Sequence, residues 1–151
     1  MVDSGDGIAI NKADAFKYFK KSADLGHIEA MFSCGCSLHD GDGVRADERE
    51  AAKYFKQSAD LGNVNGMYNY ATCLLFGDGV PINKSEAAKY YKMGADNGHL
   101  ESMNYYGILL SRGDGVPMNK SMAAKYFKMA ADQGHSEAIQ NYQKMVRSHL
   151  V

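Results

Sequence analysis

The sequence predicts an all-α solenoid, a row of stacked two-helix units, and three observations lead to that prediction. The string Gly-Asp-Gly followed by Val or Ile occurs four times, and each occurrence begins 36 residues after the previous one. The four segments align without a gap, and each contains two stretches in which apolar residues recur at helical spacing. A fixed period of this length is typical of folds in which one supersecondary unit stacks on the next. The strings begin at Gly5, Gly41, Gly77 and Gly113.

The first helix of each unit is expected to begin after a side chain that can accept from the free N–H groups of a helix start. In the second unit, Ala51, Tyr54, Phe55, Ser58 and Ala59 recur at a spacing that places them on one buried face. A glycine follows, the residue that most easily takes the left-handed conformation at a helix end. The capping residues are Asn11, Asp47, Asn83 and Asn119, and the terminal glycines are Gly26, Gly62, Gly98 and Gly134.

The second helix of each unit begins near a column of polar residues that we interpret as helix caps: His27, Asn63, His99 and His135. Its inner face carries Met or Ile, and one turn later Cys or Tyr. Beside these positions Gly35, Ala71 and Gly107 are small enough to let a neighbouring helix come close. The Gly-Asp-Gly string then closes the loop to the next unit.

Composition and charge exclude several classes of protein. With 17 Lys and Arg against 18 Asp and Glu, the chain is neither a broadly basic nucleic-acid binder nor an acidic disordered tail. A membrane span needs about 20 apolar residues in a row, and no run here approaches that length. No secretory leader is visible at the start of the sequence. Three cysteines without regular spacing indicate reduced thiols, so we expect a cytoplasmic protein.

At this point the residues resemble a known family. An aromatic–small pair in the second helix, clearest in Tyr70-Ala71 and Tyr106-Gly107, precedes the string GDGV, and the motif AAKYF or AAKYY follows. This pattern is similar to that of Sel-one-like repeats (SLRs), which are relatives of the tetratricopeptide repeat. The resemblance implies a right-handed superhelix of antiparallel helix pairs with a concave groove. It also implies an adaptor that assembles other proteins, because members of the family typically act in this way.

The resemblance sets the expected domain organisation, a single solenoid domain over residues 1–151. In the phase of the family, a unit starts with the helix after His27. The expected parts are a half-repeat at 5–26, repeats at 27–62, 63–98 and 99–134, and a C-terminal half-repeat and cap at 135–151. We interpret the outermost helices as caps, because the last one is unusually polar and the ends of a solenoid need polar faces.

Two other functions stay open as alternatives. A cysteine-rich branch of the family is associated with β-lactam binding or hydrolysis, but that branch staples each unit with a cysteine pair, and the third and fourth units here contain no cysteine. Nucleic-acid binding could use the lysine ladders of the first helices. There an Asp follows one ladder by four residues and neutralises it locally. The ladders are Lys17, Lys53, Lys89 and Lys125, and Lys20, Lys56, Lys92 and Lys128.

Catalytic, metal and cofactor sites are not expected. The histidine column places its members about 10 Å apart or more, too far for one zinc ion. The Asp-Gly-Asp-Gly string at 40–43 lacks the further acids of a calcium loop. Cys34 occupies a core column, where cysteine behaves as a small apolar residue. We therefore predict that the protein is not an enzyme.

The columns that vary from unit to unit lie on the outward face of the second helix, which by the resemblance lines the groove. Exposed aromatic rings offer large contact areas, and amide side chains can bond to a peptide backbone. The sequence thus predicts a scaffold, with a monomeric chain and no membrane span, that binds a protein or peptide partner. The candidate contact residues are Phe32, Tyr68, Asn69, Thr72, Asn104, Tyr105 and Ile108.

Overall fold

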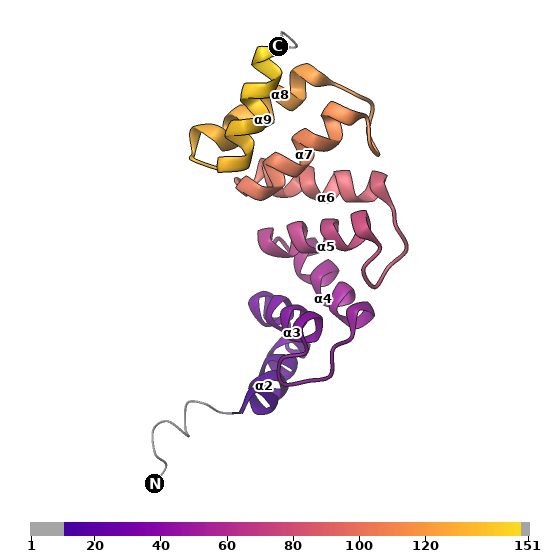
Figure 1. The fold of residues 1–151 in the computed structure, drawn as a ribbon. Coiled ribbons are helices and arrows are strands. Elements are labelled where there is room, and N and C mark those ends of the chain that lie inside the picture. Colours follow the sequence, from indigo (N-terminus) through magenta and orange to yellow (C-terminus); the bar gives the residue numbers. More distant parts are fainter. Residues whose placement is uncertain (1–10, 149–151) are drawn as a thin grey trace.

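The computed structural model describes residues 11–148, and within that range it contains eight helices and no strand. The helices stack in pairs in one curved row, with α2 and α9 at its opposite ends (Figure 1). Each helix packs chiefly against its neighbours in sequence, as a solenoid requires. The helices are α2 (Lys12–Asp24), α3 (Ile28–Asp40), α4 (Glu48–Asp60), α5 (Val64–Phe76), α6 (Lys84–Asp96), α7 (Leu100–Arg112), α8 (Lys120–Asp132) and α9 (Ser136–Arg147).

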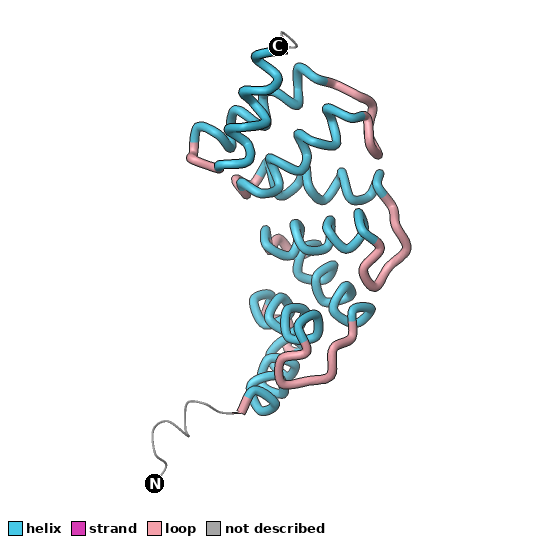
Figure 2. The backbone as a smooth tube through the Cα atoms, in the orientation of Figure 1, coloured by secondary structure: helices cyan, strands magenta, loops and turns pink. Residues whose placement is uncertain are grey.

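Two kinds of connection alternate along the row. Short turns join α2 to α3, α4 to α5, α6 to α7 and α8 to α9, and longer loops at 41–47, 77–83 and 113–119 join one pair to the next. The longer loops gather along one side of the molecule (Figure 2). Regular alternation gives every pair the same relation to the next, and the predicted all-α solenoid is confirmed. The first Gly-Asp-Gly string, which opens the expected half-repeat, lies outside the described residues.

The helix starts are capped as the sequence predicts. The side chains of Asn11, Asp47, Asn83 and Asn119 each accept from the backbone N–H three residues on, at 2.9–3.3 Å. In the second helices Asn63, His99 and His135 do the same, with the histidines accepting at Nδ1. His27 is the N-cap residue of α3, as predicted, but its side chain makes no such bond.

The second glycine of the Gly-Asp-Gly string holds adjacent repeats together. Gly79 has φ +79°, and a Cβ there would collide with the backbone carbonyl of Glu48, the first residue of α4. Gly43 and Gly115 approach the first residues of α2 and α6 in the same way. This position therefore favours glycine for two reasons: the backbone is left-handed, and the neighbouring backbone leaves no space for a Cβ.

The core is a continuous apolar stripe between the helices. It contains the predicted face of α4, where Ala51, Phe55 and Ala59 are at most 3% exposed. The small-residue column serves close packing as expected, because a Cβ on Gly35 would lie 2.6 Å from the ring of Phe55. Gly107 bears the same relation to Phe127. These contacts orient the second helices and fix which of their residues face outward.

Candidate functional site

Six of the seven candidate contact residues lie half-buried on the second helices of three consecutive pairs. Phe32 is on α3, while Tyr68, Asn69 and Thr72 are on α5. Tyr105 and Ile108 are on α7. We call this set of six residues the second-helix face. Their partial exposure leaves surface for contacts with another molecule, and such contacts stay a prediction.

Tyr68 and Tyr105 belong to one aromatic cluster, and its centre is Tyr91, which occupies the column of Phe55 in the first helices. Tyr91 of α6 is fully buried and stacks on Tyr105, with 5.1 Å between ring centroids and 7° between ring planes. Tyr68 lies 5.9 Å from Tyr91 and 6.0 Å from Tyr105, and it also contacts the His99 ring at 5.1 Å. The aromatic surface is therefore built by α5, α6 and α7 together.

A hydrogen-bonded chain fixes this cluster. The Thr72 hydroxyl lies 2.9 Å from the Tyr68 carbonyl oxygen and 2.8 Å from the Tyr91 hydroxyl. Because Thr72 has one proton and donates it to the carbonyl, Tyr91 donates to Thr72. Burial raises the pKa of the Tyr68 and Tyr91 hydroxyls, so both keep their protons at neutral pH. The hint in the sequence was Tyr91 itself, which stands where the other units have Phe.

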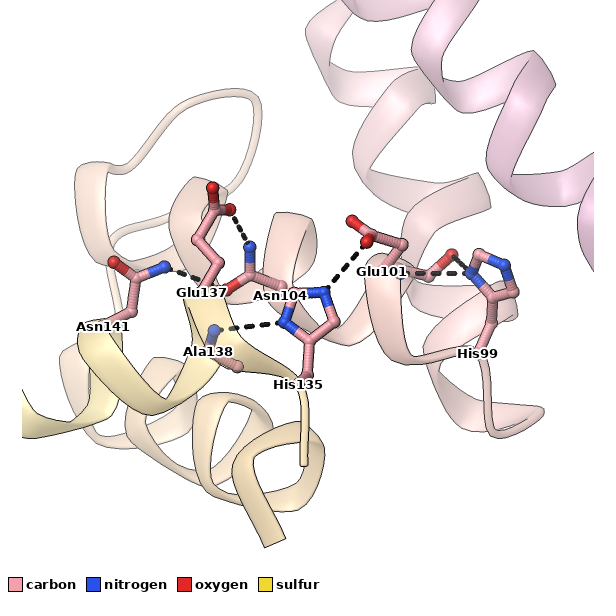
Figure 3. A network of polar contacts seen from close by, with 8 residues as sticks. His99, Glu101, Asn104, His135, Glu137, Ala138 and Asn141 are labelled. Carbon is pink, nitrogen blue, oxygen red and sulfur yellow. Dashed lines mark hydrogen bonds and ion pairs between the residues drawn. The ribbon is translucent and has the colours of Figure 1, made fainter. Parts of the chain in front are cut away.

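Asn104 is the candidate that does not reach the surface. It occupies the column of Phe32 and Tyr68, yet it is fully buried. Its amide nitrogen donates to Glu137, and its amide oxygen accepts from Asn141 at 2.9 Å (Figure 3). Both partners come from α9, which covers this position. The expectation that Asn104 offers a free amide to a partner is therefore wrong, because α9 uses the amide's hydrogen bonds.

The same close-up shows a second polar link between successive pairs. His135 Nε2 lies 3.0 Å from Glu101 Oε2 of α7, while its Nδ1 accepts from the Ala138 N–H (Figure 3). Nδ1 therefore carries the lone pair, and Nε2–H donates to the carboxylate. Asn63 makes the corresponding bond to Glu29 at 3.2 Å. A capping residue of one second helix thus bonds to an acid of the preceding second helix. These bonds explain why the column of His99 and His135 is polar without invoking a metal.

A pocket of about 270 Å³ opens between α3 and α5, beside the aromatic cluster. Asn69 and Thr72 of the second-helix face form part of its wall, and the ring of Phe55 forms another part. Asp40 contributes a carboxylate within 3.0 Å of His39 Nδ1. The remaining lining residues are Cys36, Cys73 and Asp78. Sequence reasoning missed this pocket because its walls come from different repeats.

All three cysteines are free thiols. Burial raises the pKa of Cys34 and Cys73 to about 11, and burial together with Asp40 raises the pKa of Cys36. The thiolate is the nucleophilic form, so these environments disfavour nucleophilic attack at neutral pH. Cys34 is fully buried in the core, as its column predicted.

Most lysines of the two ladders lie close to an acidic side chain of the same helix. Lys56, Lys92 and Lys128 lie within 2.9 Å of the Asp four residues on, and Lys20 lies 3.8 Å from Asp24. Asp60 also accepts from the Tyr90 hydroxyl of the next pair at 2.6 Å. Although burial opposes ionisation, the bonds from Lys56 and Tyr90 lower the pKa of Asp60. These acids thus join repeats as well as neutralising the ladder.

Within residues 11–148, no group of three or more His, Cys, Asp or Glu side chains is arranged to hold a metal ion. None of the helices described is long and apolar enough to cross a bilayer.

Comparisons with known proteins identify the repeat. The family model for the Sel1 repeat matches residues 2–27, 28–63, 64–99 and 100–135, in a phase one residue later than the sequence analysis expected. A comparison with curated protein sequences gave no match. Sel1 repeat proteins generally mediate protein–protein interactions and are generally non-catalytic scaffolds.

Three solved structures share the fold. One is c5321, a protective antigen of uropathogenic Escherichia coli with an SLR fold, at TM-score 0.89 and 30% identity over 93% of this chain. A Sel1 repeat protein from Oxalobacter formigenes has TM-score 0.88 and 26% identity over 95% of this chain. Cysteine-rich protein B of Helicobacter pylori has TM-score 0.66 and 20% identity over 84% of this chain, which shows the fold alone.

These matches cover 30% of c5321, 59% of the Oxalobacter protein and 91% of the Helicobacter protein. The present chain is thus shorter than the first two. The repeats matched by the family model account for most of the sequence, and the structure places them in the stacked helix pairs of such proteins. The chain belongs to the Sel1 repeat family.

Proposed function

We propose that this chain is a non-catalytic scaffold that binds an extended segment of a partner protein along the second-helix face. The observation that carries the proposal is the aromatic cluster in which Tyr68 and Tyr105 stay half-exposed around the buried ring of Tyr91. Aromatic residues are enriched at the centres of protein interfaces.

The cluster is held in place before any partner arrives. Tyr105 is fixed by its stacking on buried Tyr91, and Tyr91 is fixed by its bond to Thr72. Side chains that are already ordered lose little entropy on binding, which leaves more of the contact energy for affinity. Asn69 follows Tyr68 on α5 and is also half-buried, so the Asn69 amide and the Tyr68 hydroxyl can bond to a peptide backbone.

A random peptide library displayed on phage, selected on the immobilised protein, tests the proposal. We expect selection of peptides whose binding, measured as synthetic peptides by fluorescence anisotropy, is lost in the Tyr68→Ala/Tyr105→Ala variant. Far-UV circular dichroism establishes that the variant is folded. Ile108→Lys, which places a charge on the same face and keeps both tyrosines, provides a second variant.

Tyr18→Ala is the matched control, because Tyr18 is a 67% exposed tyrosine on α2, outside the second-helix face. Binding should survive this change. Peptides that bind equally well to the wild-type protein and to both variants of the second-helix face would place the binding surface elsewhere. A library that yields no binding peptide would contradict the proposed function.

A further inference from the structure

The pocket between α3 and α5 has no counterpart of the same chemistry one repeat further along. Shifting its lining by 36 residues leads to positions where Leu75 and Phe76 replace His39 and Asp40. In the same shift Tyr105 replaces Asn69. Tyr105 fills the space between α5 and α7 by stacking on Tyr91. The shorter Asn69 leaves the corresponding space open, so one polar cavity remains beside an otherwise aromatic face.

The loop aspartates show why this cavity is negative. Asp42 and Asp114, the second residues of two Gly-Asp-Gly strings, pair with Lys12 and Lys84 at 2.9 and 3.3 Å. Asp78 occupies the same place in the string between them, but the column of the two lysines holds Glu48 there. Among the described residues, no Lys or Arg lies within ion-pair distance of Asp78.

The acidic side chains act on the two cysteines in the pocket wall. Asp78 and Glu48 both act on the Cys73 thiol and, after burial, are the causes that raise its pKa. Asp40 acts in the same direction on Cys36, on the opposite wall. Two carboxylates therefore line the cavity with Glu48 nearby, and no lysine or arginine is among the lining residues. An acid thus stands where the loop ion pairs of the other units have their lysine, which leaves Asp78 available to an incoming cation.

We propose that this pocket binds a single lysine or arginine side chain of the partner segment, between Asp40 and Asp78. The inference rests on the proposed function, because it supplies the polar anchor of a segment whose apolar part lies on the tyrosine cluster. The pocket's volume, about 270 Å³, is just below the roughly 300–1,000 Å³ of pockets for small-molecule ligands, which suits one side chain. Thr72, which lines the pocket and bonds to Tyr91, connects the two subsites.

An NMR titration tests the pocket directly. The probe is Nα-acetyl-arginine methylamide, with the uncharged Nα-acetyl-norleucine methylamide as its control, added to the nitrogen-15-labelled protein at low salt. We expect saturable shifts of the Asn69, Thr72 and Asp78 amide signals with the arginine probe alone. These shifts should vanish in the Asp40→Asn/Asp78→Asn variant, in which both changes are isosteric, at an exposed and a half-buried position.

The matched control is Asp42→Asn/Asp114→Asn, which removes the same charge from two loop aspartates that are already paired with lysine. Saturation by the arginine probe should persist in this control. The inference falls if the arginine probe gives no saturable shift, or if it binds equally well to the Asp40→Asn/Asp78→Asn variant.

The selected peptides separate this inference from the proposed function. We expect one basic position in them whose replacement by glutamine weakens binding about tenfold to the wild-type protein and has little effect on binding to the Asp40→Asn/Asp78→Asn variant. Peptides that depend on Tyr68 but not on Asp40 and Asp78 would overturn the cationic subsite and leave the scaffold function standing.

Discussion

Where the two helices of a pair cross, a small residue of the first helix faces a small residue of the second. We propose that the sizes of these two side chains are matched, and the match can be tested quantitatively. Ser58 faces Gly66 across the turn between α4 and α5, whereas Gly94 faces Ser102 across the equivalent turn between α6 and α7. In the last pair both positions are alanine. The two middle pairs thus hold the same total side-chain volume in opposite distributions, whereas the first pair holds Ser22 and Ala30.

The test is the exchange of the residues in the third pair, Gly94→Ser and Ser102→Gly. A Cβ on Gly94 would lie 2.5 Å from Ser102 Oγ and 3.0 Å from Ser102 Cβ, with Met67 Cβ next at 3.8 Å. Overpacking of this kind costs about 1–3 kcal/mol, from which the better helix propensity of serine subtracts about 0.5 kcal/mol. We therefore expect Gly94→Ser to destabilise the protein by about 1–2 kcal/mol.

Ser102→Gly should cost a similar amount for a different reason. It removes the contact of 2.9 Å between Ser102 Oγ and His99 Nδ1 and places a glycine within α7. A lost hydrogen bond and a helical glycine each cost about 1 kcal/mol. The double variant, by contrast, recreates the arrangement of Ser58 and Gly66, in which the serine hydroxyl donates to a backbone carbonyl at 3.0 Å.

The assay is urea unfolding followed by far-UV circular dichroism for the wild type, the two single variants and the double variant. We expect the double variant to lie within about 1 kcal/mol of the wild type, which gives a coupling energy of about 2 kcal/mol. An unchanged dependence on urea concentration establishes that the exposed surface is comparable. If the two single effects simply add within about 0.5 kcal/mol, the explanation by matched volumes is refuted.

Three further predictions concern the contacts between repeats and the buried polar groups. Tyr90→Phe removes a hydrogen bond to Asp60 and should lower stability by about 1 kcal/mol in the same urea assay, whereas Tyr54→Phe, which has no such bond to Asp24 in the described structure, should have a smaller effect. Burial lowers the pKa of His99 below its ordinary value of about 6.5, so the unfolded chain binds more protons just below that pH. This contribution to stability is therefore present above about pH 6.5 and is lost as the pH falls; His99→Asn, which keeps a capping side chain, should lose less stability than the wild type between about pH 7.5 and 5.5. Ellman's reagent at neutral pH should react with the three thiols far more slowly in the native protein than in urea, and rapid native labelling of Cys34 or Cys73 would contradict their raised pKa.

Most of the fold could be predicted from the sequence, because each of its signals is local. The caps at Asn83 and Asn119 bond to groups three residues away, and the close approach at Gly35 and Gly107 follows from the absence of a side chain. Repetition added the rest, since four copies of one unit in register leave a stack as the way to bury their common apolar faces.

The candidate site was predictable only in part. Tyr68, Thr72 and Tyr105 do lie together on the second helices, as the variable columns indicated. Asn104 stands in one of those columns and is nevertheless buried, because α9 supplies Glu137 and Asn141 to cover it. Whether a variable residue faces a partner or the next repeat depends on the neighbour, which the column itself does not describe.

The sequence by itself therefore determined the helices, their ends and their order in a stack, since these follow from spacing along the chain. Tertiary structure alone decided which side chains meet across repeats. It placed Tyr91 against Tyr105, left an open pocket lined by Phe55, and brought Asp40 and Asp78 to the walls of that pocket. The physical reason is that such contacts join residues 14 or more positions apart, where a change in the size or charge of one side chain fills, opens or charges the space between two helices.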